Sequence, residues 1–304
     1  MGDRKDIVCV LCGSDAIEHR FHLQEPLSRR PYEIGQCKQC GYTFNCSIVS
    51  GEIAHADLFG EDFYTLFYDT CFDRGRSRET YREDAKFIWF EKALDLIEQE
   101  ILPGNLLEVG CATGFFLDYA RTRGWTVQGV EVSEYAAGEA ERIYDLDVFC
   151  GDIREADFEP NRFDAVALFD VVEHVLDPVR FLEAVLRVLK PGGQLVLITD
   201  NDASLISALT GMFYRMSFGQ FHYPCARAYP IFNVSYFSDP LLKGLLERLG
   251  LEVVYTEQMD QAVSRTRVSG WGEWMLLHTL YGLGRMLNAQ YQIFLVCQKA
   301  KLEG

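Results

Sequence analysis

Three small residues, Gly110, Ala112 and Gly114, mark a turn at which the chain could bind a ligand. The apolar run before them ends in Glu108, and the segment after them is typical of a helix start. Glycine lets a ligand approach the backbone closely, and the first turn of a helix offers unpaired N–H groups and the positive end of its dipole. The pattern predicts a strand that leads into a helix through a nucleotide-binding loop. The spacing G-x-A-x-G differs from the G-x-G-x-x-G of dinucleotide-binding folds.

Two carboxylates follow later apolar runs at positions suited to a nucleoside. Glu131 closes the run 125–130, about 20 residues after the loop, where an acidic side chain can accept hydrogen bonds from both ribose hydroxyls. Asp152 follows a third run that ends at Cys150, and we expect it to bind an adenine amino group.

A possible catalytic group, Asp170, Glu173 and His174, directly follows the apolar run 163–169. His174 is the first candidate for a general base, because the pKa of an unperturbed histidine lies near neutrality. A core or helix-capping role for this histidine is the alternative. His222 and Tyr223, in a later aromatic-rich segment, are the rival catalytic pair.

Two C-x-x-C-G knuckles near the start of the chain predict a metal site. Their cysteines are Cys9, Cys12, Cys37 and Cys40, and each pair is followed by a glycine that permits the turn. Two such knuckles typically close a tetrahedral zinc site. Four cysteine ligands leave no open position, so we expect a structural Zn²⁺ that stabilises a small module. Iron in the same ligands and a redox-active pair are the alternatives.

The composition limits the partners and the location. The chain has 304 residues, 48% of them hydrophobic, and 29 basic against 45 acidic residues give a formal charge of −16. This charge repels phosphate backbones, so we expect no nucleic-acid partner. No apolar run reaches the roughly 18 residues of a transmembrane helix, and the polar start is unlike a signal peptide. Ten cysteines without an export signal predict reduced thiols or metal ligands in a cytoplasmic protein.

Apolar runs and helical periodicity alternate through the rest of the chain. Strands are expected at 106–109, 125–130, 163–169, 194–199, 251–255 and 291–297, and helices at about 84–102, 114–123, 134–144, 178–189 and 241–249. The alternation predicts an α/β fold with a parallel sheet covered by helices on both faces.

The pattern divides the chain into three segments. They are a zinc-ribbon module at 1–46, an aromatic flap and amphipathic helix at 47–104, and a core at 105–304. Two insertions interrupt the core, at 200–237 and 258–287. The first is rich in aromatic residues and is expected to form a lid over a substrate. The second is expected to pack against this lid or a second subunit.

The motifs E-V-G-C-A-T-G, V-E-V-S, G-D-I, D-V-V-E-H-V and L-K-P-G-G, in this order, resemble class I S-adenosylmethionine (SAM)-dependent methyltransferases. The resemblance implies a Rossmann-like, seven-stranded sheet whose last strand is antiparallel, with SAM as cofactor and S-adenosylhomocysteine as product. The residues it places at the cofactor are Glu108, Gly110, Cys111, Ala112, Gly114, Phe115, Glu131, Val132, Asp152, Ile153, Phe169, Tyr64 and Tyr68. Another nucleotide, or an inactive scaffold, is the alternative.

With its ribbon, flap and lid, the whole chain is similar to zinc-ribbon methyltransferases of sugar and natural-product pathways. The similarity implies a small-molecule acceptor, with O-methylation favoured over C- or N-methylation, and it is compatible with a homodimer. Ribosomal- or transfer-RNA base methyltransferases with a zinc ribbon are a second class, disfavoured by the acidic charge. A non-enzymatic SAM-binding scaffold is the third.

Overall fold

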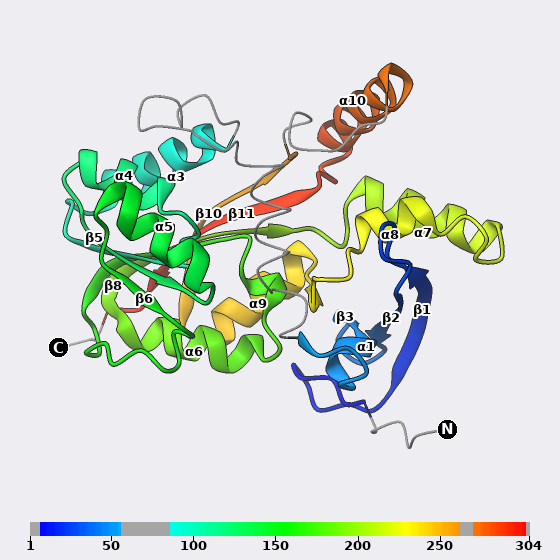
Figure 1. Ribbon diagram of the computed structural model, residues 1–304, viewed down its shortest axis with the longest axis horizontal. Helices are drawn as coiled ribbons and strands as arrows, with labels where there is room; N and C mark the ends of the chain where they lie inside the picture. Colours follow the sequence, from blue (N-terminus) through cyan, green and yellow to red (C-terminus); the bar gives the residue numbers. More distant parts are fainter. Residues whose placement is uncertain (1–6, 56–85, 262–269, 302–304) are drawn as a thin grey trace.

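The computed structural model describes residues 7–55, 86–261 and 270–301, which build two β-sheets with helices around them (Figure 1). The larger sheet has seven strands in the order β10-β11-β8-β7-β4-β5-β6. Its strands are β4 (Asn105–Val109), β5 (Thr126–Glu131), β6 (Val148–Cys150), β7 (Phe163–Phe169), β8 (Leu189–Asp200), β10 (Leu251–Met259) and β11 (Gln292–Lys299).

The strand directions confirm the predicted α/β sheet. The pairs β4–β5, β4–β7, β5–β6 and β7–β8 are parallel, whereas β11 runs antiparallel to both β8 and β10. The five parallel strands therefore have their carboxyl ends at one edge, where open α/β sheets bind ligands.

Helices cover both faces of this sheet (Figure 1). One face carries α3 (Phe87–Glu100), α4 (Phe115–Thr122) and α5 (Glu134–Tyr144), and the other carries α6 (Pro178–Val188) and α9 (Asp239–Arg248). Each group buries its apolar side chains against the strands, in a separate hydrophobic core. Local signals fix the helix starts: the Asp177 carboxylate accepts a hydrogen bond from the N–H of Arg180 at 3.1 Å, and Pro178 occupies the first turn of α6.

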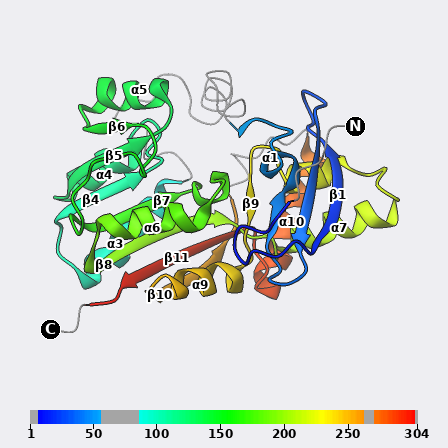
Figure 2. The same cartoon turned by 90° about the horizontal axis from the view of Figure 1, so that it is seen from below.

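The smaller sheet joins the N-terminal module to a distant part of the chain. It contains β1 (Ile17–Gln24), β2 (Pro31–Cys37) and β3 (Thr43–Asn45), followed by the short helix α1 (Cys46–Val49). Its fourth strand is β9 (Ser235–Tyr236), which pairs antiparallel with β3. Figure 2 shows β9 beside the N-terminal module.

The N-terminal module shares a hydrophobic core with helices of the large sheet. Cys9, Cys37, Tyr42 and Phe44 are buried in the same hydrophobic core as α6 and α9. The physical reason is that β3 would otherwise leave an unpaired edge, which β9 covers.

The two insertions form helices, and those of the first lie beside the small sheet. The first contains α7 (Leu205–Met216), α8 (Tyr223–Ala228) and β9, and the second contains α10 (Trp271–Leu287). α10 packs against α7, which confirms the expected contact between the two insertions. No helix of the described residues is long and apolar enough to cross a membrane.

Candidate active site and metal centre

The loop between β4 and α4 has the strained backbone that its small residues predict. Gly110, Ala112 and Gly114 have φ angles of +76°, +51° and +83°, in the left-handed region. A Cβ on Gly110 would lie 2.5 Å from a methyl carbon of Val171, and one on Gly114 would lie 2.4 Å from a methyl carbon of Leu146. The two glycines therefore allow a packing that no side chain would permit.

Glu131, at the end of β5, holds this loop in place. Its carboxylate accepts hydrogen bonds from the N–H of Ala112 at 2.8 Å and the N–H of Ser133 at 2.9 Å. The side chain is 3% exposed. The predicted ribose-binding carboxylate thus lies directly beside the predicted loop, although its contact with a ribose stays a prediction.

Two buried polar atoms beside the loop have no hydrogen-bond partner within the described residues. They are Oε2 of Glu108 and Oγ1 of Thr113. Burial, and then the charge of Glu131, raises the pKa of Glu108 well above its ordinary value. This shift favours the protonated form of the Glu108 carboxyl, which can donate a hydrogen bond as well as accept one. Buried polar atoms of this kind fit a polar ligand, such as SAM, that completes their hydrogen bonds.

Asp152 follows β6 at the same edge, but its carboxylate is already engaged. It accepts hydrogen bonds from the N–H of Arg154 at 2.8 Å and from Nε and a terminal nitrogen of the same residue at 2.9 and 2.6 Å. This pairing lowers the pKa of Asp152. Arg154, which the sequence did not single out, therefore fixes the orientation of the carboxylate expected to bind adenine.

The other predicted cofactor residues differ in exposure. Cys111 and Ile153 are 3% and 1% exposed, so we expect only their backbone to reach a cofactor. Val132 is 59% exposed and available to an adenine ring. Phe115 begins α4, and Phe169 ends β7 and is buried.

Asp170 follows β7 and brings three distant segments together. Its backbone is left-handed, with φ of +56°. One carboxylate oxygen pairs with Nζ of Lys86, just before α3, and the other accepts a hydrogen bond from Nε2 of Gln292 in β11 at 3.0 Å. Lys86 and Gln292 were not predicted, because their place in the sequence carries no local signal.

Glu173 faces inward from the 3₁₀ turn η3 (Val172–His174). It is 2% exposed, and its Oε2 accepts a hydrogen bond from the Thr199 hydroxyl at 2.8 Å. Burial, together with the charges of Asp170 and Asp200, raises the pKa of Glu173 well above its ordinary value. The shift favours the protonated, neutral form of this carboxyl.

A second acidic residue, Asp200, ends β8 beside this group. Its Oδ2 accepts hydrogen bonds from Nδ2 of Asn233 at 3.3 Å and the Tyr291 hydroxyl at 3.4 Å, and its Oδ1 accepts one from Gln292 at 3.5 Å. Burial and the charge of Asp170 raise the pKa of Asp200 from 3.8 to about 7. Sequence reasoning missed Asp200, although a strand-end acid was the signal that found Glu131 and Asp170.

His174 follows Glu173 and contacts the first insertion. Its Nδ1 lies 3.3 Å from the carbonyl oxygen of Phe232, so this nitrogen carries the proton and the lone pair is on Nε2. Nε2 of His55 lies 2.7 Å from the His174 carbonyl oxygen. Burial lowers the pKa of His174 to about 4, so the ring is neutral but is a weak base at pH 7.

The rival catalytic pair lies on another element. His222 is the N-cap of α8 and Tyr223, 54% exposed, is its first residue. α8 packs against α7 and β1, so this end of the lid faces the small sheet. The part of the insertion that reaches η3 is instead 232–234, where the N–H of Val234 also donates to the Glu173 carbonyl at 2.8 Å. The flap tyrosines Tyr64 and Tyr68 lie outside the described residues.

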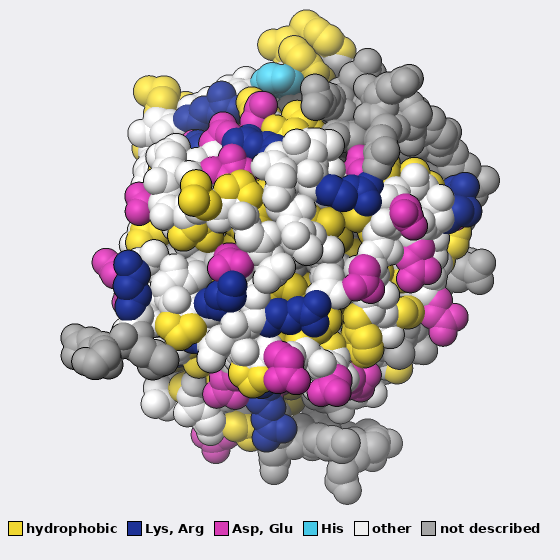
Figure 3. Space-filling view, turned by 90° about the vertical axis from the view of Figure 1, so that its left-hand side faces the viewer, with side chains coloured by type: hydrophobic (Ala, Val, Ile, Leu, Met, Phe, Trp, Pro, Cys, Tyr) yellow, Lys and Arg dark blue, Asp and Glu magenta, His cyan; other side chains and the backbone are white. Residues whose placement is uncertain are grey.

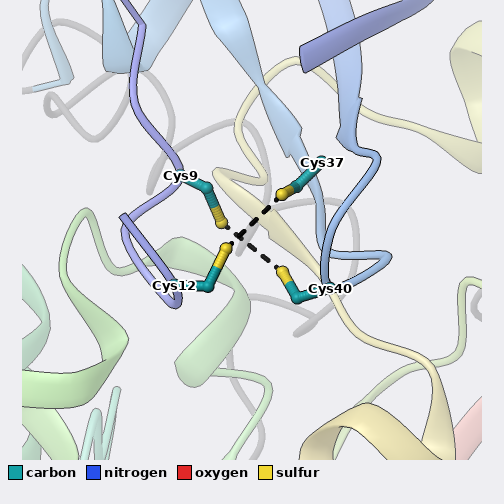
Figure 4. Close-up of side chains that lie close together, drawn as sticks. All are labelled: Cys9, Cys12, Cys37 and Cys40. Carbon is teal, nitrogen blue, oxygen red and sulfur yellow. Dashed lines mark hydrogen bonds between the residues drawn. The ribbon is translucent and has the colours of Figure 1, made fainter. Parts of the chain in front are cut away.

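The four predicted metal ligands converge on one point (Figure 4). The sulfur atoms of Cys9 and Cys40 are 3.6 Å apart, those of Cys12 and Cys37 are 3.5 Å apart, and all four lie within 4.8 Å of one another. Sulfur atoms bound to one tetrahedral zinc ion at about 2.3 Å are about 3.8 Å apart. Gly13 and Gly41 have φ angles of +75° and +79°, which forms the turn of each knuckle. The ligand set therefore fits a closed zinc site.

Comparison with known proteins agrees with this architecture. A methyltransferase-domain family matches residues 81–256. The ubiquinone biosynthesis O-methyltransferase of Dechloromonas aromatica is 32% identical over 134 residues, which cover 41% of this chain and 56% of that protein. The protein of the same name from Coxiella burnetii is 35% identical over 115 residues, 36% of this chain and 49% of that protein. The chain thus spans about half the length of these relatives.

A SAM-dependent methyltransferase of known structure from Archaeoglobus fulgidus has a similar fold. Its TM-score is 0.50 at 19% identity, and the match covers 78% of this chain and all of the other. The sheet, the loop after β4 and the family match together define a class I methyltransferase fold with a Cys₄ ribbon at its N-terminus. The chain belongs to the methyltransferase-domain family.

Proposed function

We propose that the protein transfers a methyl group from SAM to a hydroxyl of a small sugar or natural-product intermediate. The observation that carries the proposal is the arrangement at one sheet edge. The strained loop after β4, with the unsatisfied Glu108 and Thr113 beside it, lies next to the group of polar side chains that follows β7 and β8.

The chain's own residues would bind and orient the reactants. Glu131 would hold the ribose, Asp152 the adenine edge, and the loop backbone the remainder of the cofactor. SAM, when bound, supplies a methyl group activated by a positively charged sulfonium. Asp170 and its neighbours would place negative charge near this cation, and the lid segment 232–234 would limit the access of water.

Two observations favour a small hydroxyl compound as the acceptor. The matched relatives are named O-methyltransferases. Asp170 and Asp200 would repel a phosphorylated acceptor, which favours an uncharged one over a nucleotide-linked sugar.

An RNA acceptor is disfavoured by the surface charge. The chain carries a formal charge of −16. On the face shown in Figure 3, the Lys and Arg side chains of the described residues are interspersed with Asp and Glu and do not gather into a basic surface.

The zinc site would support the fold and take no part in the transfer. Cys9, Cys12, Cys37 and Cys40 would hold the ion in a closed set of thiolates, and β3 connects this module to β9 in the lid. A homodimer also stays a proposal, supported by apolar side chains exposed on α10, such as Trp271 at 77% and Met286 at 84%.

Methyl transfer from SAM with a labelled methyl group tests the proposal. Three sets of acceptors are offered. The first contains uncharged hydroxylated aromatic compounds and uncharged sugars, the second nucleotide-linked sugars, and the third RNA transcripts. Label in an ether of the first set is expected. Labelled RNA would support the RNA-methyltransferase alternative. SAM binding without transfer to any set would support a scaffold.

A further inference from the structure

We propose that Asp200 takes the proton from the acceptor hydroxyl and that Asn233 positions this carboxylate, an inference that rests on the proposed O-methylation. Asp200 ends β8, and β8 is the neighbour of β7 in the sheet. Nε2 of Gln292 donates to both Asp170, at 3.0 Å, and Asp200, at 3.5 Å. The two carboxylates therefore lie close together, on either side of one amide group. Because Val171 lies against Gly110, this place adjoins the cofactor loop.

The other acids at this edge are less suited to accept a proton. Glu173 is 2% exposed and accepts a hydrogen bond from the Thr199 hydroxyl, and burial raises its pKa, which favours its protonated form. Asp170 forms an ion pair with Lys86, which stabilises its charge and weakens it as a base.

His174 is also a poor proton acceptor, because its pKa is lowered to about 4. Asp200 is partly exposed at the end of β8, and its pKa, raised to about 7, suits a base at physiological pH. The ionisable groups around it are Asp170, Glu173 and His174 after β7, Lys86 before α3, Tyr236 in β9 and Tyr291 before β11.

Asn233 supplies a second, independent sign of a ligand. It is 1% exposed, its Nδ2 donates to Asp200, and its Oδ1 has no hydrogen-bond partner within the described residues. The amide is held by its backbone, since the N–H of Asn233 donates to Pro230 and that of Val234 donates to Glu173. A hydroxyl of the acceptor that donates to Oδ1 would satisfy this buried atom.

The reaction step balances with these groups alone. The acceptor oxygen forms a bond to the methyl carbon while the bond from that carbon to the sulfonium sulfur breaks, and the sulfur keeps the electron pair. The hydroxyl proton moves to an Oδ atom of Asp200. The products are the methyl ether, neutral S-adenosylhomocysteine and a protonated Asp200, which returns its proton to water.

The first test needs no acceptor. In protein saturated with S-adenosylhomocysteine, the carboxyl carbons of aspartate are followed by ¹³C NMR as a function of pH, and the signal lost in Asp200→Asn identifies this residue. A midpoint between about pH 6 and 8 is expected from the shifted carboxyl. A midpoint near the ordinary value for aspartate would overturn the proposal, whatever the acceptor is.

The second test uses the best acceptor from the labelled-methyl assay. Asp200→Asn should lower kcat by about 100-fold or more and remove the acidic limb of the pH–rate profile, with SAM affinity within about twofold. Asn233→Ala should lower kcat less and shift this limb, as expected of a positioning residue. Asp147→Asn, an exposed acid before β6, is the matched control and should leave the rate unchanged.

These results separate the two proposals. If wild type methylates a hydroxyl and Asp200→Asn keeps both its rate and its pH profile, the role of Asp200 is wrong while O-methylation stands. If wild type methylates only RNA, the proposed O-methylation of a small molecule is wrong, and the proposed role of Asp200 in that reaction is wrong too.

Discussion

The Glu131 carboxylate combines two tasks, since it holds the cofactor loop through Ala112 and Ser133 and is expected to bind the ribose. Glu131→Ala should therefore weaken SAM binding by about 1–3 kcal/mol, the range for a charge-assisted hydrogen bond and its unmet partner. Isothermal titration calorimetry measures this directly. Glu139→Ala, which removes a carboxylate that pairs with Arg142 on the surface of α5, is the control. Equal affinities for wild type and Glu131→Ala would reject the assignment.

The raised pKa of Asp200 predicts that the stability of the protein depends on pH. Its pKa is raised from 3.8 to about 7 on folding, so between these values the folded state binds more protons than the unfolded state. Its contribution to the free energy of unfolding therefore falls as pH rises across this window and is constant above it. The Tm of Asp200→Asn, relative to wild type, should rise from pH 4 to 7 and then level off. A constant Tm difference, measured by calorimetry, would contradict the shifted pKa.

At the residue scale, the sequence predicted acids and small residues that follow apolar runs. Glu131, Asp152 and Asp170 are found at strand ends because a strand places its last residue at a known edge of a parallel sheet. Asn233 and Gln292 could not be predicted in this way, because long-range packing brings them to Asp200. His174 shows a further limit: its residue type suggested a base, whereas its burial lowers its pKa to about 4.

At the scale of elements, β3 and the lid segment 231–236 form one unit. Asn45, fully buried at the end of β3, caps α1 with Oδ1, donates from Nδ2 to the Ile231 carbonyl at 3.0 Å, and donates from its N–H to Val234 at 2.9 Å. Because 232–234 contacts His174 and Asp200, the small sheet supports the edge of the large sheet at which we propose that catalysis takes place.

Asn45→Ala should lower the free energy of unfolding by about 2 kcal/mol, since it removes a helix cap and leaves a buried carbonyl without its donor. Urea unfolding followed by circular dichroism measures the change. The control is Asn105→Ala, whose side chain makes one long, exposed hydrogen bond at 3.4 Å and should change stability by less than about 0.5 kcal/mol. Similar losses for the two variants would mean that Asn45 is not a specific link.

The strands and helices of the large sheet were predictable because their apolar periodicity is local. β7 begins and ends where the sequence indicated, and α5 spans the expected residues. β9 was not predicted, because two residues, Ser235 and Tyr236, carry no periodic pattern. Its pairing with β3 depends on a contact across about two thirds of the chain, which only the tertiary fold reveals.

At the scale of the whole molecule, the metal site should stabilise more than the ribbon. We expect close to one zinc per chain by elemental analysis, and none in Cys37→Ser. Since β9 completes the sheet of β2 and β3, loss of zinc should raise hydrogen exchange in 231–236 as well as in the N-terminal module. Cys150→Ser, which replaces an exposed thiol, is the control. Increased exchange confined to residues before 46 would show that the module is independent.

We propose that the carboxyl edge of the large sheet binds SAM and an acceptor together. A crystal structure of the protein with S-adenosylhomocysteine tests this most directly. We expect a ribose at Glu131, an adenine beside Val132 and Asp152, and a sulfur atom that faces Asp170 and Asp200. A ligand bound elsewhere, or a sulfur atom turned away from these two carboxylates, would contradict it.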